Sequence, residues 1–411
     1  MPFSGVSAMD RKREFVELAG VEGANVRELC RRFGVSPTTG YKWLGRWRAE
    51  GAAGLGERSR RPAGSPGRTA ASVEAAVLAV RAASNEAWGG RKIRHVLARD
   101  AAAGQAAGQA AVPSASTITA ILRRHGRLAA GLAEHRGPFR RFERETPNEL
   151  WQMDFKGHFA LHAGTGTGRC HPLTVLDDCS RFNLMLCACG DEQAGTVKRA
   201  LEAAFRRYGL PLAILADRGP PWGEAGGELT GLAAWLMRLG VRLLHGRPRH
   251  PETQGKEERF HRTLKAEALA GRSFRDLAAC QRAFDAFRQR YNHERPHEAL
   301  GMAAPATRYR PSPRRFPEVL PPIDYGSGAA VRKVDGEGFI SFRNRPFRIG
   351  RALRAQPVVL RPTAEDGVFA VCFCSQRVRE IDLRPSAGPG CGLVDDAERR
   401  PQGPQPRQPQ P

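Results

Sequence analysis

Three carboxylates in the middle of the chain have the type and the setting for chemistry on phosphate esters. Asp154 lies in the strand-like stretch "LWQMDF", Asp217 ends the buried run "LAILAD", and Glu258 lies in "GKEERFHRTLK". In open α/β sheets, ligands gather at the carboxyl ends of strands. Converging carboxylates suit Mg²⁺, and two such ions about 4 Å apart can hold attacking and leaving oxygens in line. We therefore expect these three acids to be catalytic residues and ligands of two Mg²⁺ ions, with Mn²⁺ as a substitute.

Two adjacent acids, Glu257 and Glu258, compete for the third position. At about 100° per residue, Phe260, Leu264 and Ala268 fall on one side of a helix that must face the core. Glu257 lies only about 60° from Phe260, whereas Glu258 lies well away from this apolar stripe. Helical phase therefore favours Glu258 as the ligand. Its alternative is a solvated ion pair with Arg262, four residues later.

The charge of the chain points to a polyanionic partner. Its 411 residues contain 65 Lys and Arg against 42 Asp and Glu, a formal net charge of +23. Such basic proteins usually meet nucleic acid, because phosphates supply the matching charge and release counterions on binding. GC-rich coding, which also raises the Arg content, is the alternative explanation. We expect contacts with DNA phosphates along the helix of Glu258, from Lys256, Arg262 and Lys265.

Residues 10–50 have the pattern of a helix-turn-helix DNA-binding domain. An apolar helix (Val26, Leu29, Cys30, Phe33) is followed by a short turn at Gly34-Val35-Ser36 and a second helix that Ser36 caps and Pro37 begins. We expect Tyr41, Leu44 and Trp47 on the inner side of that helix, and Thr38, Thr39, Lys42 and Arg46 on the side that faces DNA. An ordinary three-helix packing module is the alternative. Residues 51–70 form a basic Gly/Pro/Arg linker, in which Arg60 and Arg61 can contact DNA.

The remaining segments complete a multidomain α+β chain. Residues 71–127 resemble a second helix-turn-helix unit, with Ser116 as a candidate cap of its last helix. Strands and helices alternate over residues 147–310, which predicts an α/β core with a mixed sheet. Short strands over residues 320–385 suggest a small β-barrel. The Pro/Gln-rich tail, residues 386–411, is expected to be disordered. Without a signal-peptide pattern or an apolar run of membrane length, we expect a cytoplasmic protein with no membrane contact.

Several stretches together resemble a known family. "WQMDF", "DDCSR", "DRGPPW", "HPETQGKEERFHRTLK" and "YNHERPHEALG" are similar to the integrase core of bacterial insertion-sequence transposases. "LGERSRRP" and "VRKVDGEGFISFR" make the IS481 family the nearest match, and the resemblance runs from about residue 10 to 385. It implies an RNase H-like integrase catalytic core, related to that of retroviral integrases, with a DDE triad on Asp154, Asp217 and Glu258. It also implies a bacterial, nucleoid-associated protein.

The chain departs from the family pattern at two positions. Arg218 follows the second Asp where Asn is common, so a cation stands beside the expected metal site and either contacts DNA or weakens metal binding. Glu257 stands where the family generally has an apolar residue. Neither change removes a ligand of the implied triad. Near the family's "DD-x-SR" turn, we expect Asp178 to accept turn hydrogen bonds rather than to bind metal, and we expect His293 and His297 to pack at a helix end rather than to touch DNA.

The resemblance implies an insertion-sequence transposase. Such an enzyme binds the terminal inverted repeats, hydrolyses a phosphodiester to free a 3′-OH, and transfers that hydroxyl to target DNA. Joining two double-stranded ends implies at least a homodimer. The alternative is a catalytically inactive relic that acts only as a helix-turn-helix DNA-binding protein. A tyrosine recombinase is excluded, because Tyr291, Tyr309 and Tyr325 lack the Arg and His-x-x-Arg residues that such an enzyme needs upstream of its nucleophile.

Overall fold

The computed structural model describes residues 7–58, 68–104, 111–128, 143–162, 168–223, 229–246 and 255–384. The chain divides into two compact units, Met1–Arg68 and Thr69–Pro411, and each is described by itself. Two predicted DNA contacts, Arg60 and Arg61, and the predicted disordered tail lie outside the described residues.

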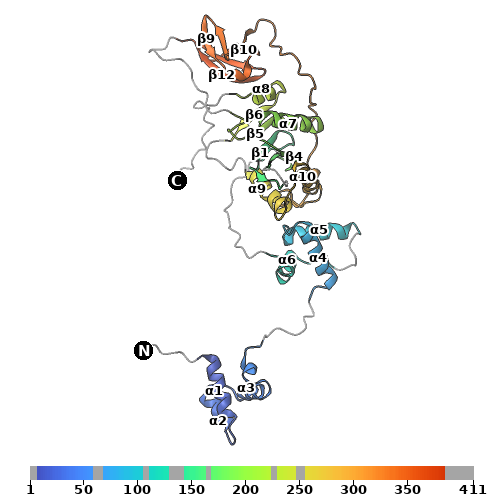
Figure 1. Ribbon diagram of the computed structural model, residues 1–411, viewed down its shortest axis with the longest axis vertical. Helices are drawn as coiled ribbons and strands as arrows, with labels where there is room; N and C mark the ends of the chain where they lie inside the picture. The colour runs from blue at the N-terminus through green and yellow to red at the C-terminus, as the bar shows by residue number, and fades with distance from the viewer. Residues whose placement is uncertain are drawn as a thin grey trace, which may run out of the picture. The chain divides into compact units, whose positions relative to one another are not determined.

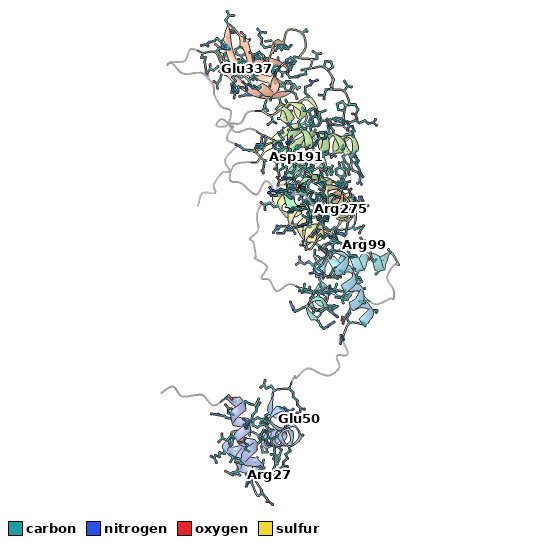
Figure 2. The ribbon with its side chains drawn as sticks, viewed as in Figure 1. Arg27, Glu50, Arg99, Asp191, Arg275 and Glu337 are labelled. Carbon is teal, nitrogen blue, oxygen red and sulfur yellow. The ribbon has the colours of Figure 1, made fainter. Side chains whose placement is uncertain are left out.

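The first unit contains three helices, α1 (Ala8–Ala19), α2 (Val26–Arg32) and α3 (Pro37–Glu50), and a short 3₁₀ turn, Gly51–Leu55 (Figure 1). Asn25 caps α2 and Ser36 caps α3, and Pro37 begins α3 as the sequence predicts. The turn after α3 packs Leu55 into the same small core as Phe15 and Cys30. Arg27 of α2 and Glu50 of α3, both labelled in Figure 2, lie on the surface, and Glu50 pairs with Arg58.

One prediction about the inner side of α3 is wrong. Tyr41 is 52% exposed, whereas Gly40 and Leu44 are buried and Trp43 and Trp47 are partly buried. The reason is Gly40: a Cβ there would collide with the side chains of Cys30 and Phe15. Because this position has no side chain, α3 approaches the other helices along Gly40, and Tyr41 turns to solvent.

The second unit begins with three further helices, α4 (Ala71–Ala83), α5 (Gly90–Ala102) and α6 (Ala115–Arg124). Their core contains Val77, Trp88, Ile93 and Ile118. Ser114, not Ser116, caps α6: its hydroxyl accepts a hydrogen bond from the backbone N–H of Thr117. Ser116 lies inside the helix because Pro113 precedes the cap and the helix starts directly after it.

The central region is built on a six-stranded mixed sheet in the order β2-β3-β1-β5-β6, with β4 paired to the other edge of β3. Its strands are β1 (Leu150–Phe155), β2 (Phe159–Ala160), β3 (Arg169–Asp177), β4 (Asn183–Cys189), β5 (Ala213–Ala216) and β6 (Arg242–His245). Strands β3 and β4 are antiparallel, and a turn at Asp178-Cys179-Ser180 joins them as predicted. Strands β1, β5 and β6 are parallel, which places their carboxyl ends at one edge.

Helices cover both faces of this sheet (Figure 1). On one face, α7 (Ala194–Tyr208) and α8 (Gly231–Arg238) pack on Trp151, Met153 and Ile214. On the other face, α9 (Gly255–Leu264) and α10 (Leu277–His293) pack on Cys170, Leu176 and Leu186. A π-helical turn, η3 (Lys265–Leu269), continues α9. Since strand side chains alternate between faces, neighbours of Trp151 and Met153 along β1 point toward α9.

The C-terminal strands form two antiparallel sheets. One has four strands in the order β12-β11-β10-β7 (Gln376–Asp382, Val368–Phe373, Pro357–Pro362 and Ala330–Lys333), and the other is the hairpin of β8 (Phe339–Phe342) and β9 (Arg345–Arg348). The predicted short strands are thus present as antiparallel sheets, and within the described ranges the pairing of these strands does not show the predicted small β-barrel. Residues of both sheets pack in one apolar core, which also contains Ala234 and Met237 of α8.

Among the described residues, no helix combines the length and the apolar character that crossing a bilayer requires.

Candidate active site

Strand register brings two of the three predicted acids together. In the parallel pair β1–β5, Leu150 lies opposite Ala213 and Gln152 lies opposite Leu215. Continuing this register by two residues places Asp154 opposite Asp217, directly after the end of β5. Paired residues of neighbouring strands point to the same face and lie about 5 Å apart. Both carboxylates therefore project from the carboxyl edge of the sheet on the side that α9 covers.

Helix α9 places the third acid on that side. Phe260, Leu264 and Ala268 are each at most 1% exposed and pack into the core with α10, which confirms the predicted apolar stripe. Glu258 is exposed and Glu257 is buried, as helical phase predicts for the two neighbours. Glu258 also contributes to the electrostatic field at Asp154. Of the two neighbouring acids, Glu258 is thus the one that is open to solvent.

Glu257 has its own partners beneath the acidic edge. Its Oε2 accepts a hydrogen bond from the Thr174 hydroxyl at 3.0 Å, and the same hydroxyl lies 2.9 Å from His261 Nε2. His261 Nε2 is 3.7 Å from Glu257 Oε2, and its Nδ1 is 3.9 Å from Asp154 Oδ2. The Thr174 hydroxyl also lies 2.9 Å from the backbone carbonyl oxygen of Asp154. Glu257 is therefore part of a polar cluster that contacts Asp154 from behind.

The electrostatics of the edge are those of crowded negative charge. Burial, and next the charge of Asp217, raise the pKa of Asp154 to about 7. Burial, and next the charge of Asp154, raise the pKa of Glu257 well above its usual value. Burial, and next the charge of Lys156, lower the pKa of His261 to about 4, so this imidazole is neutral at pH 7. A cation at this edge would relieve the repulsion between the acids.

The three predicted ligands do not surround a common point at which a metal ion could bind. Within the described ranges, no three His, Cys, Asp or Glu side chains stand close enough together to hold a metal ion. The donor chemistry nevertheless suits a hard divalent cation, because all three groups are carboxylates.

Residues flanking the acids contact the protein itself. Arg218 is exposed, and its Nε lies 3.4 Å from the carbonyl oxygen of Gly246, at the end of β6. His245 Nδ1 lies 2.7 Å from the carbonyl oxygen of Asp217. Because both contacts run between the ends of β5 and β6, they brace the loop that carries Asp217.

Lys256, a predicted DNA contact, is paired with a carboxylate of the protein itself. Its side chain is 16% exposed and pairs with the carboxylate of Asp178, which is fully buried. Asp178 also accepts hydrogen bonds from Gln152 Nε2 at 2.6 Å and the Arg144 backbone N–H at 2.7 Å. Asp178 is thus structural, as predicted, although the hydrogen bonds of its turn go to Asp177, which accepts from Ser180.

The other predicted DNA contacts vary in accessibility. Lys42, Thr38, Arg262 and Lys265 are exposed, and Arg46 is partly buried. Thr39 is partly buried in the cap of α3, where its hydroxyl lies 2.9 Å from that of Ser36. Tyr41, exposed between Thr38 and Lys42, is an additional candidate that the predicted helical phase placed in the core.

Two histidines near the end of α10 were predicted to pack rather than to touch DNA. His297 is buried with its ring edge-on to Tyr291, at 4.7 Å between centroids, and burial lowers its pKa to about 2. His293 is exposed, with its ring 6.2 Å from that of Phe182. The prediction is confirmed for His297.

His261 and Thr174 belong to this polar cluster but were not among the site residues expected from the sequence. A signal existed for His261, which follows Glu257 by four residues and therefore lies on the same side of the helix. Thr174 offered no such signal, because only the pairing of β3 with β1 places it under Asp154.

Five family models match the chain. A helix-turn-helix domain matches residues 11–63 and a homeodomain-like domain matches residues 39–122. Two integrase core domain models match residues 144–251 and 239–305. The C-terminal domain of IS481 family transposases matches residues 329–387. The chain belongs to the IS481 transposase family. In this IS481-family chain, the integrase core models cover the acidic edge of the sheet and α9.

The chain is similar to two curated insertion-element proteins. It is 31% identical over 160 residues to an uncharacterized 31.7 kDa protein of insertion element IS407 from Burkholderia multivorans, covering 39% of this chain and 54% of that protein. It is 30% identical over 162 residues to an uncharacterized 39.2 kDa protein of insertion element IS476 from Xanthomonas euvesicatoria, covering 39% and 44%. The chain thus spans about half the length of the curated relatives it matches.

Among solved structures, the chain is similar to two retroviral assemblies. The HTLV-2 integrase catalytic core domain in complex with magnesium matches at 14% identity and a TM-score of 0.30, over 40% of this chain and 99% of that one. A simian T-cell lymphotropic virus intasome in complex with the PP2A regulatory subunit B56 gamma matches at 17% identity and a TM-score of 0.34, over 68% and 98%.

Proposed function

We propose that the protein is a DNA transposase that cuts and joins DNA with a DDE triad, Asp154, Asp217 and Glu258. One observation carries the proposal: Gln152 of β1 lies opposite Leu215 of β5, and extending this parallel register by two residues would set Asp154 beside Asp217, while Glu258 is exposed on α9. Membership of a transposase family with an integrase core supports it. The raised pKa of Asp154 supports it too, since crowded carboxylates are what a divalent cation stabilises.

The triad would hold two Mg²⁺ ions, which Mn²⁺ can replace. When bound, Mg²⁺ supplies Lewis-acid polarisation of the phosphoryl group and activation of the attacking oxygen. The chain supplies the rest. Arg262 and Lys265, exposed on the side of α9 that carries Glu258, bind the phosphates that flank the scissile one. Thr174 and His261 hold the Asp154 segment against α9.

Two in-line displacements at phosphorus make up the reaction. In the first, water attacks a phosphodiester at the end of the element and the bond to the 3′ oxygen breaks. One proton of the water goes to the departing 3′-OH, and the other is lost from the new 5′-phosphate. In the second, the freed 3′-OH attacks a phosphodiester of the target, and the displaced target 3′ oxygen takes its proton. No bond between protein and DNA forms in either step.

The partner in this proposal is double-stranded DNA, as element end and as target. Helix α3, with Thr38, Tyr41 and Lys42 exposed, would contact the terminal inverted repeat. Two ends must be joined to one target, so the active form would contain at least two chains.

The test is cleavage and strand transfer with oligonucleotides that carry the inverted repeats flanking the gene, in Mg²⁺ or Mn²⁺. Asp154→Asn, Asp217→Asn and Glu258→Gln should each abolish both steps and leave end binding within about twofold of the wild type, since none of them removes a phosphate-binding cation. A wild-type chain that binds ends in both metals and never cuts would overturn the proposal.

That failure would favour a second function, DNA binding without chemistry. Two observations speak for it: the described acids are not closed into a metal-binding group, and a cation, Arg218, follows Asp217. A chain of this kind would act as a regulator at the element ends. Restoration of cleavage by Arg218→Asn would separate a damaged enzyme from a pure binding protein.

A further inference from the structure

A second buried carboxylate lies at the far end of α9, away from the proposed triad. Glu267, in the π turn η3, is 2% exposed. Its Oε1 accepts hydrogen bonds from the indole Nε1–H of Trp88 at 3.0 Å and from Nε of Arg295 at 2.8 Å. Arg295 is itself 8% exposed and lies over the ring of Tyr291. Glu267 therefore joins three parts of the chain in one buried ion pair: the helices α4–α6, the end of α9, and the segment after α10.

Trp88 makes this contact a rigid one. It is 5% exposed and belongs to the core that α4, α5 and α6 share, with Val77 and Ile93. An indole held in its own core cannot follow a moving acceptor unless the three helices move with it. A further bond, from Asn85 Nδ2 to the carbonyl oxygen of Ala266 at 2.9 Å, holds the same turn. The α4–α6 helices and α9 are thus packed as one body.

The π turn explains how one helix serves two cores. The N–H of Ala270 donates to the carbonyl oxygen of Lys265 at 2.7 Å, one residue beyond the α-helical partner. In this wide turn both Glu267 and its neighbour Ala268 are buried, Ala268 against the sheet and α10 and Glu267 against Trp88. A regular helix separates adjacent residues by about 100°, and the wider turn lets both reach buried surroundings.

The exposed side of the same helix carries cations between Glu258 and this junction. Glu258, Arg262 and Lys265 are all exposed, and Glu267 is nine positions after Glu258. At about 1.5 Å per residue this is about 13.5 Å, the rise of about four base pairs of B-DNA.

Cations continue on the other side of the junction. A pocket of about 670 Å³ lies between α5, α6 and Glu298, and its lining includes Arg91, Lys92 and Arg123. Burial, and next the charge of Arg295, lower the pKa of Lys92 to about 8, which places its ammonium group at the same junction. Lys92 of α5 also senses the charge of Arg259 on α9, so cations of the two elements lie near each other at this junction.

We propose that Glu267 is a positioning residue that locks α4–α6 to the end of α9, so that each chain holds a DNA end with α4–α6 and cuts that same end with its own triad. The inference rests on the proposed function and adds which chain serves which end. Glu267 touches neither DNA nor metal in this proposal. It acts through the placement of α4–α6 relative to Glu258.

The first experiment loosens the junction without removing a cation. Trp88→Phe keeps the ring in its core and deletes the N–H that Glu267 accepts, and Glu267→Gln keeps an acceptor and deletes the charge. Each should lower cleavage at the correct phosphate by about 10²-fold, the cost of a misplaced substrate, and should produce cuts at neighbouring phosphates. End binding should change by less than about twofold, because the phosphate contacts remain.

Asp285→Asn is the matched control. Asp285 is an exposed acid of α10 that accepts a hydrogen bond from Gln281 Nε2 at 3.0 Å, and its loss should leave both rate and cut position unchanged. Glu267→Gln leaves Arg295 buried without its counter-charge and can fail to fold, in which case Trp88→Phe decides. Accurate, full-rate cleavage by a folded Trp88→Phe chain would show that the junction positions nothing.

The second experiment asks which chain cuts which end. Mixed complexes of an Asp154→Asn chain and an Arg91→Ala/Arg123→Ala chain are isolated through two affinity tags. Each variant alone should be inactive, and the mixture should stay inactive, because neither chain has both the DNA-holding helices and the triad. Restored cleavage in the mixture would mean that α4–α6 serves the triad of another chain and would refute the inference. Activity of the Arg91→Ala/Arg123→Ala chain alone would refute it as well.

The failure of this inference differs from the failure of the proposed function. A wild-type chain that binds DNA ends but does not cut them at all would contradict the proposed function, whereas the inference is tested only with a wild type that cuts.

Discussion

Helix α9 and the π turn η3 that continues it carry one buried glutamate near each end, and the two are stabilised in different ways. Glu267 shares its Oε1 with the guanidinium of Arg295 and the indole N–H of Trp88. Glu257 meets the hydroxyl of Thr174 and a neutral His261, and the charge of Asp154 lies close by. One carboxylate faces a full positive charge, and the other faces a further negative one.

This difference shows which end of the helix is built for stability and which for reactivity. A buried ion pair can specify one arrangement of the elements that it joins. A buried acid beside other acids lowers the stability of the metal-free protein. Such destabilising clusters of charge are typical of functional sites. We therefore regard the Glu267 end as the anchored end and the Glu257 end as the charged end.

The largest expected effect distinguishes the two neighbours at the charged end. Glu258→Gln should lower single-turnover cleavage by about 10³-fold, the loss expected when a group that stabilises transition-state charge is removed. Glu257→Gln should keep cleavage within about tenfold of the wild type, because Gln preserves the hydrogen bond with Thr174. A dead Glu257→Gln enzyme beside an active Glu258→Gln enzyme would reverse the assignment of the two faces of α9.

The next effect concerns the anchored end. Glu267→Ala leaves Arg295 buried without a counter-charge and the indole N–H of Trp88 without an acceptor. Removal of one partner of a buried ion pair typically costs about 3–5 kcal/mol, and we expect a loss of unfolding free energy of this size. Chemical denaturation with urea measures it. A loss below about 1 kcal/mol would show that the ion pair is not closed in solution and would erase the contrast with Glu257.

At the charged end, protons and metal should compete for Asp154. Its raised pKa, about 7, means that the carboxylate must lose a proton to bind a cation at neutral pH. At fixed, subsaturating Mg²⁺, cleavage should fall by about tenfold for each pH unit below 7, one proton per metal-binding event. A rate profile measured from pH 5 to 8 tests this, and raising the Mg²⁺ concentration should shift the curve to lower pH. A flat profile would show that Asp154 is fully ionised in the absence of metal.

Glu257, the buried acid of the charged end, should also be replaceable by an apolar residue. Glu257→Leu removes a carboxylate from an apolar helix face, and we expect a gain in unfolding free energy of about 1–3 kcal/mol at pH 8. Since the folded-state pKa of Glu257 is raised, its stability contribution is fully present below pH 4 and is lost as the pH rises toward the folded pKa. The gain should therefore be smaller at pH 5 than at pH 8. Urea denaturation at both values measures it, and an equal gain at both would show that burial does not favour the protonated acid.

The smallest effect lies on the exposed face that joins the two ends. Arg262→Gln should reduce the slope of log binding constant against log salt by about 0.9, the contribution of one phosphate contact. Lys256→Gln should leave that slope unchanged and lower stability instead, because Lys256 pairs with the buried Asp178. Salt titrations of end binding measure both slopes. Equal reductions would show that Lys256 leaves Asp178 when DNA binds.

Local periodicity carried most of what the sequence could predict. The stripe of Phe260, Leu264 and Ala268 selects the buried face of α9, and with it the positions of Glu257 and Glu258. The anchored end was not predictable in this way. Glu267 and Trp88 lie 179 positions apart, and nothing local in either stretch announces the contact. The phase of α3 was mispredicted because Gly40 lets the helix approach its neighbours on an unexpected side.

The π turn between Glu257 and Glu267 makes the number of residues in this helix important for its buried contacts. Its extra residue is what allows Glu267 and Ala268 to be buried together. Deletion of one residue within Lys265–Leu269 would restore regular winding, in which Glu267 and Ala268 cannot both keep their buried surroundings. Substitutions in this turn alter one contact at a time, but an insertion or deletion would disturb both of these contacts together. Among descendants of this chain, the number of residues between Glu258 and Glu267 should therefore be kept more strictly than their identities.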